Sequence, residues 1–404
     1  MKIRAKIVLT MDGPPIENGA VVVAGKHIAE VGRVDELEDG EVIDLGDQVL
    51  MPGLINAHCH LDYTMMRHAI DPPRSFTGWV RRINALKRSL DNADYLAAID
   101  RGFAEVKRWG TTSVCNIESF PELMARLPPS PIRTWWFYEM IDIRHRITTD
   151  DVVAGALSFF QQRANSLDTF GLSPHTPFTA SLALYRLAKS CAQNFGMPLT
   201  THVAESREEW QMFAAAEGAL YEFVMLLQRP MEDCGGTTPF AHLWRSGAID
   251  ARWLLAHMNE LNEEDFALLA ELPPGGAPQV VHCPGSHRYF GHSPFPFQRL
   301  HRLGVNISVG TDSLASTDSL SLLDELRTLH RNEPWLTPEQ LLQTVTVNPA
   351  QALNHRGLLG VISRGAFADL IALPVSGSLA TVHEEIIAHH APISWMMIDG
   401  QLRP

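Results

Sequence analysis

The sequence has little of what would set it apart from ordinary globular proteins. Only five cysteines occur in 404 residues, far apart and in no C-x-x-C arrangement, which excludes a disulfide framework and a thiolate metal site. No apolar run approaches the roughly 18 residues of a membrane span. The N-terminal apolar run meets Asp12 too early for a secretory signal. These absences predict a cytoplasmic protein that does not enter a membrane.

Basic residues are also scarce. Thirty-three lysines and arginines against 46 aspartates and glutamates give a formal charge of -13. Nucleic-acid backbones and anionic membranes are therefore unfavourable partners. With 45% hydrophobic and 20% charged residues, the composition is typical of a chain that buries a large core. We expect a folded protein whose main partner is a small molecule.

Strand-like segments with glycine-containing turns occupy both ends of the chain, and a different pattern lies between them. In the middle, eight short apolar segments alternate with stretches of helical periodicity. Eight parallel strands, each followed by a helix, form a closed (β/α)8 barrel. The predicted α/β fold is a TIM barrel over residues 51–356, with a small β-sandwich domain built from residues 1–50 and 357–404.

The predicted barrel strands place polar residues where such barrels carry their chemistry, at the carboxyl ends. The predicted strands are residues 49–58, 111–117, 132–138 and 168–173, and four more that end near residues 204, 257, 284 and 312.

Two histidines close the first of these strands. Because side chains alternate along a strand, His58 and His60 project to one side and Cys59 projects to the other. Two imidazoles on one face can bind a metal ion, but hydrogen-bonded or surface histidines explain an isolated H-x-H equally well. This motif alone leaves the metal site open.

Three later strand ends carry further candidate residues for this site. His202 and Glu205 follow the fifth strand, His257 ends the sixth and Asp312 ends the eighth. Taken singly, Glu205 or Asp312 could be a helix cap and His257 a buried, hydrogen-bonded histidine. Taken jointly, histidines and an aspartate at one barrel mouth suit Zn²⁺, with Fe²⁺ as the alternative. A metal ion there would lower the pKa of a water molecule to about 7 and make it a hydrolytic nucleophile.

The run PGLINAHCHLD, with HVAE, LLAH and GTDSLAS at later strand ends, resembles the metal-dependent amidohydrolase superfamily. The most similar branch contains cytosine, guanine and S-adenosylhomocysteine deaminases and the triazine hydrolases. The resemblance covers nearly the whole chain, and GVISRGAFADLIAL is similar to the composite β domain of that family. It implies that His58, His60, His202 and Asp312 bind one metal ion. It also implies a homodimer, since members of the family commonly pair.

The resemblance further implies the catalytic roles. Glu205 would shuttle a proton to a ring or amidine nitrogen, His257 would support the tetrahedral intermediate, and Asp312 would act as ligand and base. The expected reaction is hydrolytic deamination of an amino-substituted N-heterocycle or nucleoside. Two alternatives remain: hydrolysis of another C–N or C–Cl bond of a related ring, and a barrel that binds a heterocycle without turning it over.

Three further residues are candidate substrate contacts. His175 lies in SPHTPFT, which resembles the substrate-contacting PHAP segment of the family, although it could be a turn histidine. His287 stands where the related loop commonly has asparagine, and Gly285 where arginine is common. Trp79 ends a segment that is either a covering loop or a lid over a flat heterocycle.

Lysine is absent between Lys107 and Lys189, and again after Lys189. A carbamylated lysine on the fourth barrel strand, which bridges two metal ions in binuclear relatives, is therefore excluded. The only carboxylate in that strand, Asp168, lies at its wrong end. We expect one divalent ion per chain.

Overall fold

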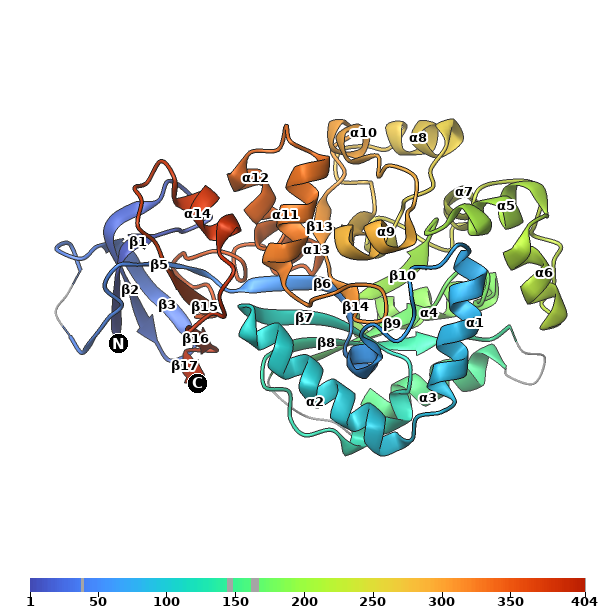
Figure 1. Ribbon diagram of the computed structural model, residues 1–404, viewed down its shortest axis with the longest axis horizontal. Helices are drawn as coiled ribbons and strands as arrows, with labels where there is room; N and C mark the ends of the chain where they lie inside the picture. Colours follow the sequence, from blue (N-terminus) through green and yellow to red (C-terminus); the bar gives the residue numbers. More distant parts are fainter. Residues whose placement is uncertain (38–39, 144–147, 161–166, 404) are drawn as a thin grey trace.

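The computed structural model describes residues 1–37, 40–143, 148–160 and 167–403. Two sheets dominate it (Figure 1). The larger sheet is parallel, with the strand order β13-β12-β11-β10-β9-β8-β7-β6-β14. Its strands are β6 (Leu54–His60), β7 (Thr111–Glu118), β8 (Arg133–Met140), β9 (Asp168–Pro174), β10 (Leu199–Val203), β11 (Trp253–His257), β12 (Gln279–His282), β13 (Ile307–Val309) and β14 (Asp312–Ser313).

The two outer strands of this order, β13 and β14, are halves of one strand that closes the sheet. The N–H of Gly310 donates to the carbonyl of His282 in β12 (3.0 Å), and the N–H of Thr311 donates to the carbonyl of His58 in β6 (3.1 Å). A Cβ on Gly310 would lie 2.7 Å from backbone atoms of His58, so glycine permits this close approach. The sheet is therefore an eight-stranded barrel, and the predicted fold is confirmed.

Helices connect the barrel strands and surround them (Figure 1). The α-helices of this layer are α1 (Phe76–Lys87), α2 (Asn92–Arg108), α3 (Thr149–Phe160), α4 (Leu182–Phe195), α5 (Arg207–Ala215), α6 (Ala219–Leu226), α7 (Pro239–Arg245), α8 (Glu263–Ala270), α9 (Pro284–Phe290), α10 (Phe297–Arg302), α11 (Leu322–Asn332), α12 (Pro338–Gln343) and α13 (Val347–Ala352). Short 3-10 helices η1 (Leu61–Met66) and η2 (Pro121–Arg126) follow β6 and β7.

Helix α2 shows how the local sequence specifies these elements. The Asp91 carboxylate caps the first turn, and the Asp94 side chain accepts a hydrogen bond from the Asp91 N–H (3.0 Å), forming a capping box. Tyr95, Ile99 and Val106, spaced four and seven residues apart, are buried on one face of the helix. This spacing turns the apolar face of α2 towards the barrel.

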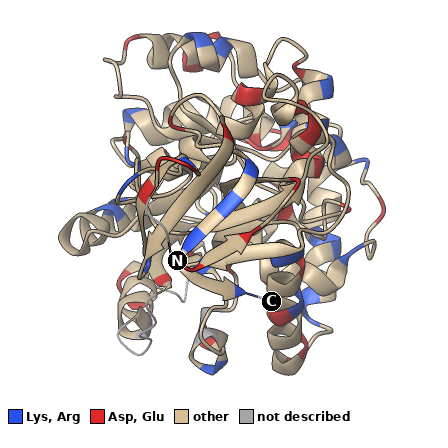
Figure 2. Cartoon of the chain, turned by 90° about the vertical axis from the view of Figure 1, so that its left-hand side faces the viewer, with Lys and Arg blue, Asp and Glu red and all other residues tan. Residues whose placement is uncertain are grey.

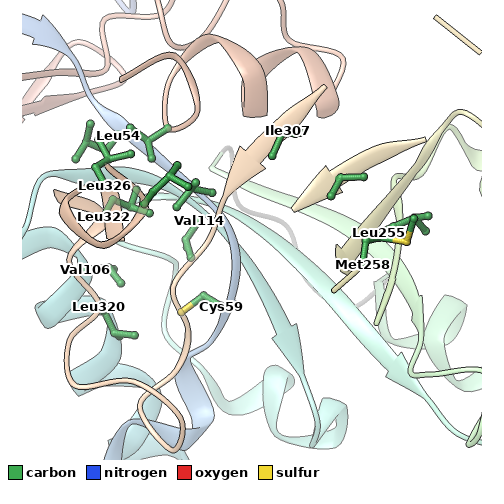
Figure 3. Packing of buried hydrophobic residues seen from close by; sticks show 14 of the residues in the cluster. Leu54, Cys59, Val106, Val114, Leu255, Met258, Ile307, Leu320, Leu322 and Leu326 are labelled. Carbon is green, nitrogen blue, oxygen red and sulfur yellow. The ribbon is translucent and has the colours of Figure 1, made fainter. Parts of the chain in front are cut away.

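One large apolar cluster joins the barrel to its helices. Leu54 of β6, Val106 of α2, and Leu322 and Leu326 of α11 all belong to it (Figure 3). Each is almost fully buried, and burial of such side chains stabilises a fold by about 1.5–3 kcal/mol apiece. The core therefore holds the strands, and hence their carboxyl ends, in fixed positions.

The second sheet combines strands from both ends of the chain, drawn in blue and red in Figure 1. Its order is β17-β16-β15-β5-β1-β2-β3, with β4 paired to β1. Antiparallel pairing of β5 with β15 joins the two ends. The strands are β1 (Lys2–Val8), β2 (Ile16–Ala24), β3 (His27–Arg33), β4 (Val42–Asp44), β5 (Gln48–Pro52), β15 (Leu370–Pro374), β16 (Trp395–Ile398) and β17 (Gln401–Arg403). Helix α14 (Val382–Ala388), between β15 and β16, packs against α11 and α12.

The first predicted barrel strand, residues 49–58, spans a junction between the two sheets. The chain leaves β5 at Pro52 and enters β6 at Leu54, so Gly53 alone separates them. A Cβ on Gly53 would collide with the side chain of Thr112, which explains why the sequence has glycine there. The division into residues 1–50, 51–356 and 357–404 stays a prediction. In the structure, the sheet formed by both ends of the chain includes β5 and so continues to Pro52, beyond the end of the predicted first part.

Charged residues are spread over the periphery. In the view of Figure 2, basic and acidic residues are interspersed over the outer elements. Among the described residues, no helix combines the length and apolar character needed to cross a membrane.

Candidate metal centre and active site

Three buried histidines converge at the carboxyl end of the barrel. His58 and His60 end β6, and His202 lies in β10, directly across the mouth. One ring nitrogen of each lies within 4.8 Å of the others, and the Nε2 atoms of His60 and His202 are 3.2 Å apart. Both ring nitrogens of His58 and Nδ1 of His60 are buried without a hydrogen-bond partner. Partnerless buried nitrogens are costly, and a divalent ion would satisfy those that face the centre, so these residues fit a metal site.

Asp312 adds a carboxylate to this cluster. Its Oδ1 lies 3.8 Å from the Nε2 atoms of both His58 and His60. Its Oδ2 accepts hydrogen bonds from the hydroxyls of Ser286 (2.6 Å) and Ser316 (3.1 Å). One oxygen is thus held by the two serines, while the other faces the histidines.

The backbone of His175 orients His202. Nδ1 of His202 donates to the carbonyl oxygen of His175 (3.0 Å), which leaves Nε2 to face the cluster. The His175 ring itself lies 5.1 Å from that of His202, measured between centroids. Its Nε2 is 3.7 Å from Oε1 of Glu139. Burial lowers the pKa of His175 to about 4. The structure therefore brings His175 to the site, and its substrate contact stays a prediction.

Glu205 and His257 form the next part of the mouth. Oε1 of Glu205 lies 3.8 Å from Nε2 of His257. Burial, followed by the charges of Asp312 and Glu209, raises the pKa of Glu205 well above its usual value. Burial, followed by the neighbouring rings of His202 and His58, lowers the pKa of His257 well below its usual value. The geometry pairs a carboxyl group that readily holds a proton with a neutral imidazole.

A second glutamate fixes the backbone of Glu205. The Glu209 carboxylate accepts hydrogen bonds from the N–H groups of Ala204 (3.1 Å) and Glu205 (2.7 Å). The side-chain amide of Asn259 donates to the carbonyl of Glu205 (2.9 Å). Glu209 is buried, and burial raises its pKa to about 7. Sequence reasoning did not single out Glu209, because its position three residues after Ser206 is typical of a helix cap.

Three residues at these strand ends have left-handed backbone conformations. Ala204, His257 and Asp312 have φ values of 52°, 77° and 59°. Such conformations cost non-glycine residues about 1–3 kcal/mol each and persist only where the surrounding structure imposes them. Ala204 lies next to Glu205, and His257 and Asp312 are themselves predicted site residues. These strained residues therefore lie at the carboxyl ends of the strands that carry the predicted site.

Two predicted substrate contacts lie on rim helices. The indole ring of Trp79 in α1 meets Phe290 of α9 edge to face, with centroids 5.0 Å apart. In α9, Nε2 of His287 donates to the carbonyl of Ser293 (2.8 Å), and its ring is 5.3 Å from that of His282. Packing between rim elements accounts for both positions without a substrate, so the covering-loop and lid interpretations of α1 both remain.

The structure also explains one departure from the family pattern. The N–H of Gly285 donates to Oε2 of the buried Glu325 (2.6 Å). A Cβ on Gly285 would press against that carboxylate and against Thr317. An arginine in the same backbone position would displace Glu325, so this chain has glycine there.

An acidic group beside the metal centre was missed by sequence reasoning. Asp62, Glu118 and Glu139 follow or end β6, β7 and β8. Both carboxylate oxygens of Asp62 and one of Glu118 are buried without a hydrogen-bond partner. Burial raises the pKa of Asp62 well above its usual value and that of Glu118 to about 7. His175 and Lys87 instead lower the pKa of Glu139 against burial. The charge of Lys87, the last residue of α1, opposes the rise at Asp62 and Glu118. The strand-end position of Glu118 was the signal that could have revealed this group.

Lys87 also ties this acidic side to the metal centre. Its Nζ donates to the hydroxyl of Tyr63 (2.6 Å), which also shares a hydrogen bond with Ser119 (2.8 Å). The Tyr63 ring stacks on His60, with centroids 5.3 Å apart and planes 7° from parallel. Helix α1 is therefore connected to one of the three histidines through a single tyrosine.

Comparison with known proteins identifies the family. The sequence profile of the amidohydrolase family matches residues 49–402. The 5-methylthioadenosine/S-adenosylhomocysteine deaminase of Pyrococcus furiosus is 29% identical over 383 residues, 92% of this chain and 85% of that protein. The aminodeoxyfutalosine deaminase of Deinococcus radiodurans is 30% identical over 354 residues, 84% of this chain and 82% of that protein.

Solved structures share the fold. An adenosine deaminase from Xanthomonas campestris with bound zinc superposes with a TM-score of 0.83 at 24% identity, covering 99% of this chain and 92% of that one. The aminofutalosine deaminase of Helicobacter pylori, in complex with methylthio-coformycin, gives a TM-score of 0.86 at 21% identity and covers all of both chains. The family match spans most of the sequence and includes every predicted metal ligand. The chain belongs to the metal-dependent amidohydrolase family.

Proposed function

We propose that this protein is a hydrolytic deaminase of an adenosine-type nucleoside, which replaces the purine amino group with oxygen and releases ammonia. One observation carries the proposal: ring nitrogens of the buried His58, His60 and His202 converge, and Oδ1 of Asp312 lies 3.8 Å from the Nε2 atoms of His58 and His60. At the same mouth, Oε1 of Glu205 lies 3.8 Å from Nε2 of His257. Relatives that align over most of this chain are named 5-methylthioadenosine/S-adenosylhomocysteine deaminase and aminodeoxyfutalosine deaminase, which supports a nucleoside substrate.

The proposed metal ligands are His58, His60, His202 and Asp312, which would hold a single ion. Nitrogen and carboxylate donors suit Zn²⁺, with Fe²⁺ as the alternative. When bound, such an ion acts as a Lewis acid that makes water nucleophilic near neutral pH. The count of one ion is supported by the position of Asp168. It is the only carboxylate of β9 and lies at the amino end of that strand, far from the barrel mouth, so β9 offers no carboxylate to bridge a second ion.

The proposed proton transfers use Glu205, His257 and Asp312. Glu205 takes a proton from the attacking water and gives it to the ring nitrogen beside the amino-bearing carbon, which makes that carbon electrophilic. Neutral His257 donates a hydrogen bond to the oxygen that has added. Asp312 accepts the second proton of the water and passes it to the amino group. One water is consumed, one carbonyl forms and one ammonia leaves.

The test is a substrate panel with Zn²⁺-reconstituted protein. Adenosine, 5′-deoxyadenosine and 5′-methylthioadenosine are followed by ammonia release and by the ultraviolet change from adenine to hypoxanthine. We expect both signals in equal amounts. Ammonia from none of these nucleosides, together with chloride or amine release from a triazine, would instead support the alternative hydrolase.

A further inference from the structure

Glu325 is a buried glutamate that takes no part in the proposed proton transfers. It lies in the first turn of α11, with 2% of its surface exposed. Leu322 and Leu326 of the same helix belong to the large apolar cluster, so the core fixes the position of this turn. A buried carboxyl group is costly unless hydrogen bonds satisfy it. The partners of Glu325 therefore show which segments it holds.

The two carboxylate oxygens of Glu325 contact two different segments. Oε2 accepts a hydrogen bond from the N–H of Gly285 at the start of α9 (2.6 Å). Oε1 accepts a longer one from the hydroxyl of Thr317, in the loop between β14 and α11 (3.5 Å). Because α9 packs against both α11 and β14, one side chain of α11 reaches both segments (Figure 1).

The residues next to these two partners hold Asp312. Ser286 follows the glycine, and Ser316 precedes the threonine. Their hydroxyls donate to Oδ2 of Asp312, at 2.6 Å and 3.1 Å, and the two hydroxyl oxygens lie 3.1 Å apart. Both serines are almost fully buried. Glu325 therefore contacts the immediate neighbours of both serines that orient this carboxylate.

Gly285 makes this arrangement possible. A Cβ at this position would overlap both the Glu325 carboxylate and the Thr317 hydroxyl. Any other amino acid here would push these two groups aside. Glycine is therefore needed for Glu325 to contact both segments.

We propose that Glu325 is a positioning residue for Asp312. By holding the two segments that carry Ser286 and Ser316, it fixes the direction in which the Asp312 carboxylate faces the three histidines. This inference rests on the proposed function, because it takes Asp312 to be a metal ligand and a base. Hydrogen-bonded partners of a metal ligand typically change metal affinity or activity by about 10–100-fold when they are removed.

The test removes both interactions of Glu325 and measures zinc affinity as well as turnover. Glu325→Met keeps the length of the side chain but has only a weak acceptor in place of the two oxygens. We expect the zinc Kd, measured by competition with a chelator, to rise about tenfold, and kcat for adenosine to fall about tenfold with KM little changed.

Glu325→Gln is the conservative variant. Its amide oxygen can accept the Gly285 N–H, and its amide nitrogen can donate to the Thr317 hydroxyl. The zinc Kd and kcat should therefore stay within about threefold of those of the unmodified protein. Values as poor as those of Glu325→Met would show that the two hydrogen bonds are not what matters, and would overturn the inference.

The two serines decide whether Glu325 acts through them. In a protein that already carries Ser286→Ala and Ser316→Ala, Glu325→Met should change the zinc Kd by less than about twofold, because the residues that it positions no longer hold Asp312. A merely structural role would leave the zinc Kd unchanged in Glu325→Met, or would raise it by the same factor with and without the serines. Either result overturns the inference.

Asp265→Ala is the matched control for loss of a buried carboxylate. Asp265 accepts hydrogen bonds from the Thr238 hydroxyl and from the N–H of Asn262 (2.9 Å) at the start of α8. Its removal should lower stability against urea without changing the zinc Kd. A rise in Kd equal to that in Glu325→Met would make the zinc effect a general result of destabilisation and would overturn the inference.

Gly285→Ala serves as a second variant if Glu325→Met does not fold. Its Cβ displaces the Glu325 carboxylate, so the zinc Kd should again rise about tenfold, and an unchanged Kd overturns the inference. Deamination is read separately. If the zinc Kd follows the expected pattern but no nucleoside reacts, the deaminase function fails and the positioning role stands. If adenosine reacts but the zinc Kd does not respond to these variants, the positioning role is wrong and the deaminase function stands.

Discussion

The two sides of the barrel mouth hold their carboxylates in different ways. On the catalytic side, from β10 to β14, Asp312 is fixed by two serine hydroxyls, and Glu209 by two backbone N–H groups. On the acidic side, from β6 to β8, Asp62 and Glu118 have buried oxygens without partners and share the charge of Lys87.

The two arrangements control different properties of a carboxylate, namely its position and its protonation. Neutral donors define where a carboxylate oxygen points. A single cation facing several carboxylates defines mainly how many protons the group holds. The proposed catalytic side therefore fixes the positions of its carboxylates, whereas the acidic side depends on the charge of Lys87 and so on the placement of α1.

The largest expected effect comes from removing a histidine of the metal centre. In His202→Ala, the cluster loses one of its three imidazoles, and we expect bound zinc to fall from about one equivalent to nearly none, with kcat reduced more than about 10³-fold. Elemental analysis after dialysis and initial rates measure the two quantities. His330→Ala, an exposed histidine on α11, should change neither. Full zinc occupancy in His202→Ala would remove His202 from the ligand set.

The next effect isolates proton transfer from metal binding. Glu205→Gln keeps the shape of the side chain but cannot carry a proton, so we expect normal zinc content and kcat lowered about 10²–10⁴-fold. Zinc analysis and turnover are measured on the same sample. Near-normal turnover would show that another group moves the proton.

A smaller effect should follow from loosening the support of Glu205. In Glu209→Gln, only one amide oxygen remains to accept the N–H groups of Ala204 and Glu205. We expect kcat to fall about tenfold, with KM and zinc content little changed, because position rather than binding is affected. Glu222→Gln on α6, which is exposed, is the control. A larger change in KM than in kcat would assign Glu209 to substrate binding instead.

The last effect concerns stability on the acidic side. Burial raises the pKa of Glu118 from 4.5 to about 7, so the folded state favours the protonated carboxyl. Its contribution to stability is fully present below pH 4.5 and is lost as the pH rises through 7. Glu118→Gln, which is always neutral, should therefore be about 3 kcal/mol more stable than the unmodified protein at pH 8, and within about 1 kcal/mol of it at pH 5.

Urea denaturation at the two pH values measures this difference. Glu222→Gln, at an exposed glutamate on α6, should show no such pH dependence. If Glu118→Gln is less stable at pH 8, the ionised carboxylate is paired with Lys87 more strongly than burial opposes it.

The sequence was sufficient for the residues whose position follows from strand periodicity. His58 and His60 alternate with Cys59 at a strand end, and the structure brings both to one point with His202. The interruption of the last barrel strand at Gly310 could not be predicted, because it depends on contact with β6, some 250 residues away.

The acidic side escaped sequence reasoning for a similar reason. Glu118 and Glu139 end strands that read as apolar runs, and their counter-charge, Lys87, comes from a helix whose docking no local pattern specifies.

The pairing of β5 with β15 has a consequence for how the protein is made. Pro52 and Leu370 face each other in this ladder, and Pro52 leaves the ribosome long before Leu370. Contacts of such long sequence separation form late, because the intervening chain must first become ordered. During translation, the strand that leads directly into His58 and His60 therefore has an open edge until β15 has been synthesised, so the contact that anchors the segment carrying these two histidines forms late.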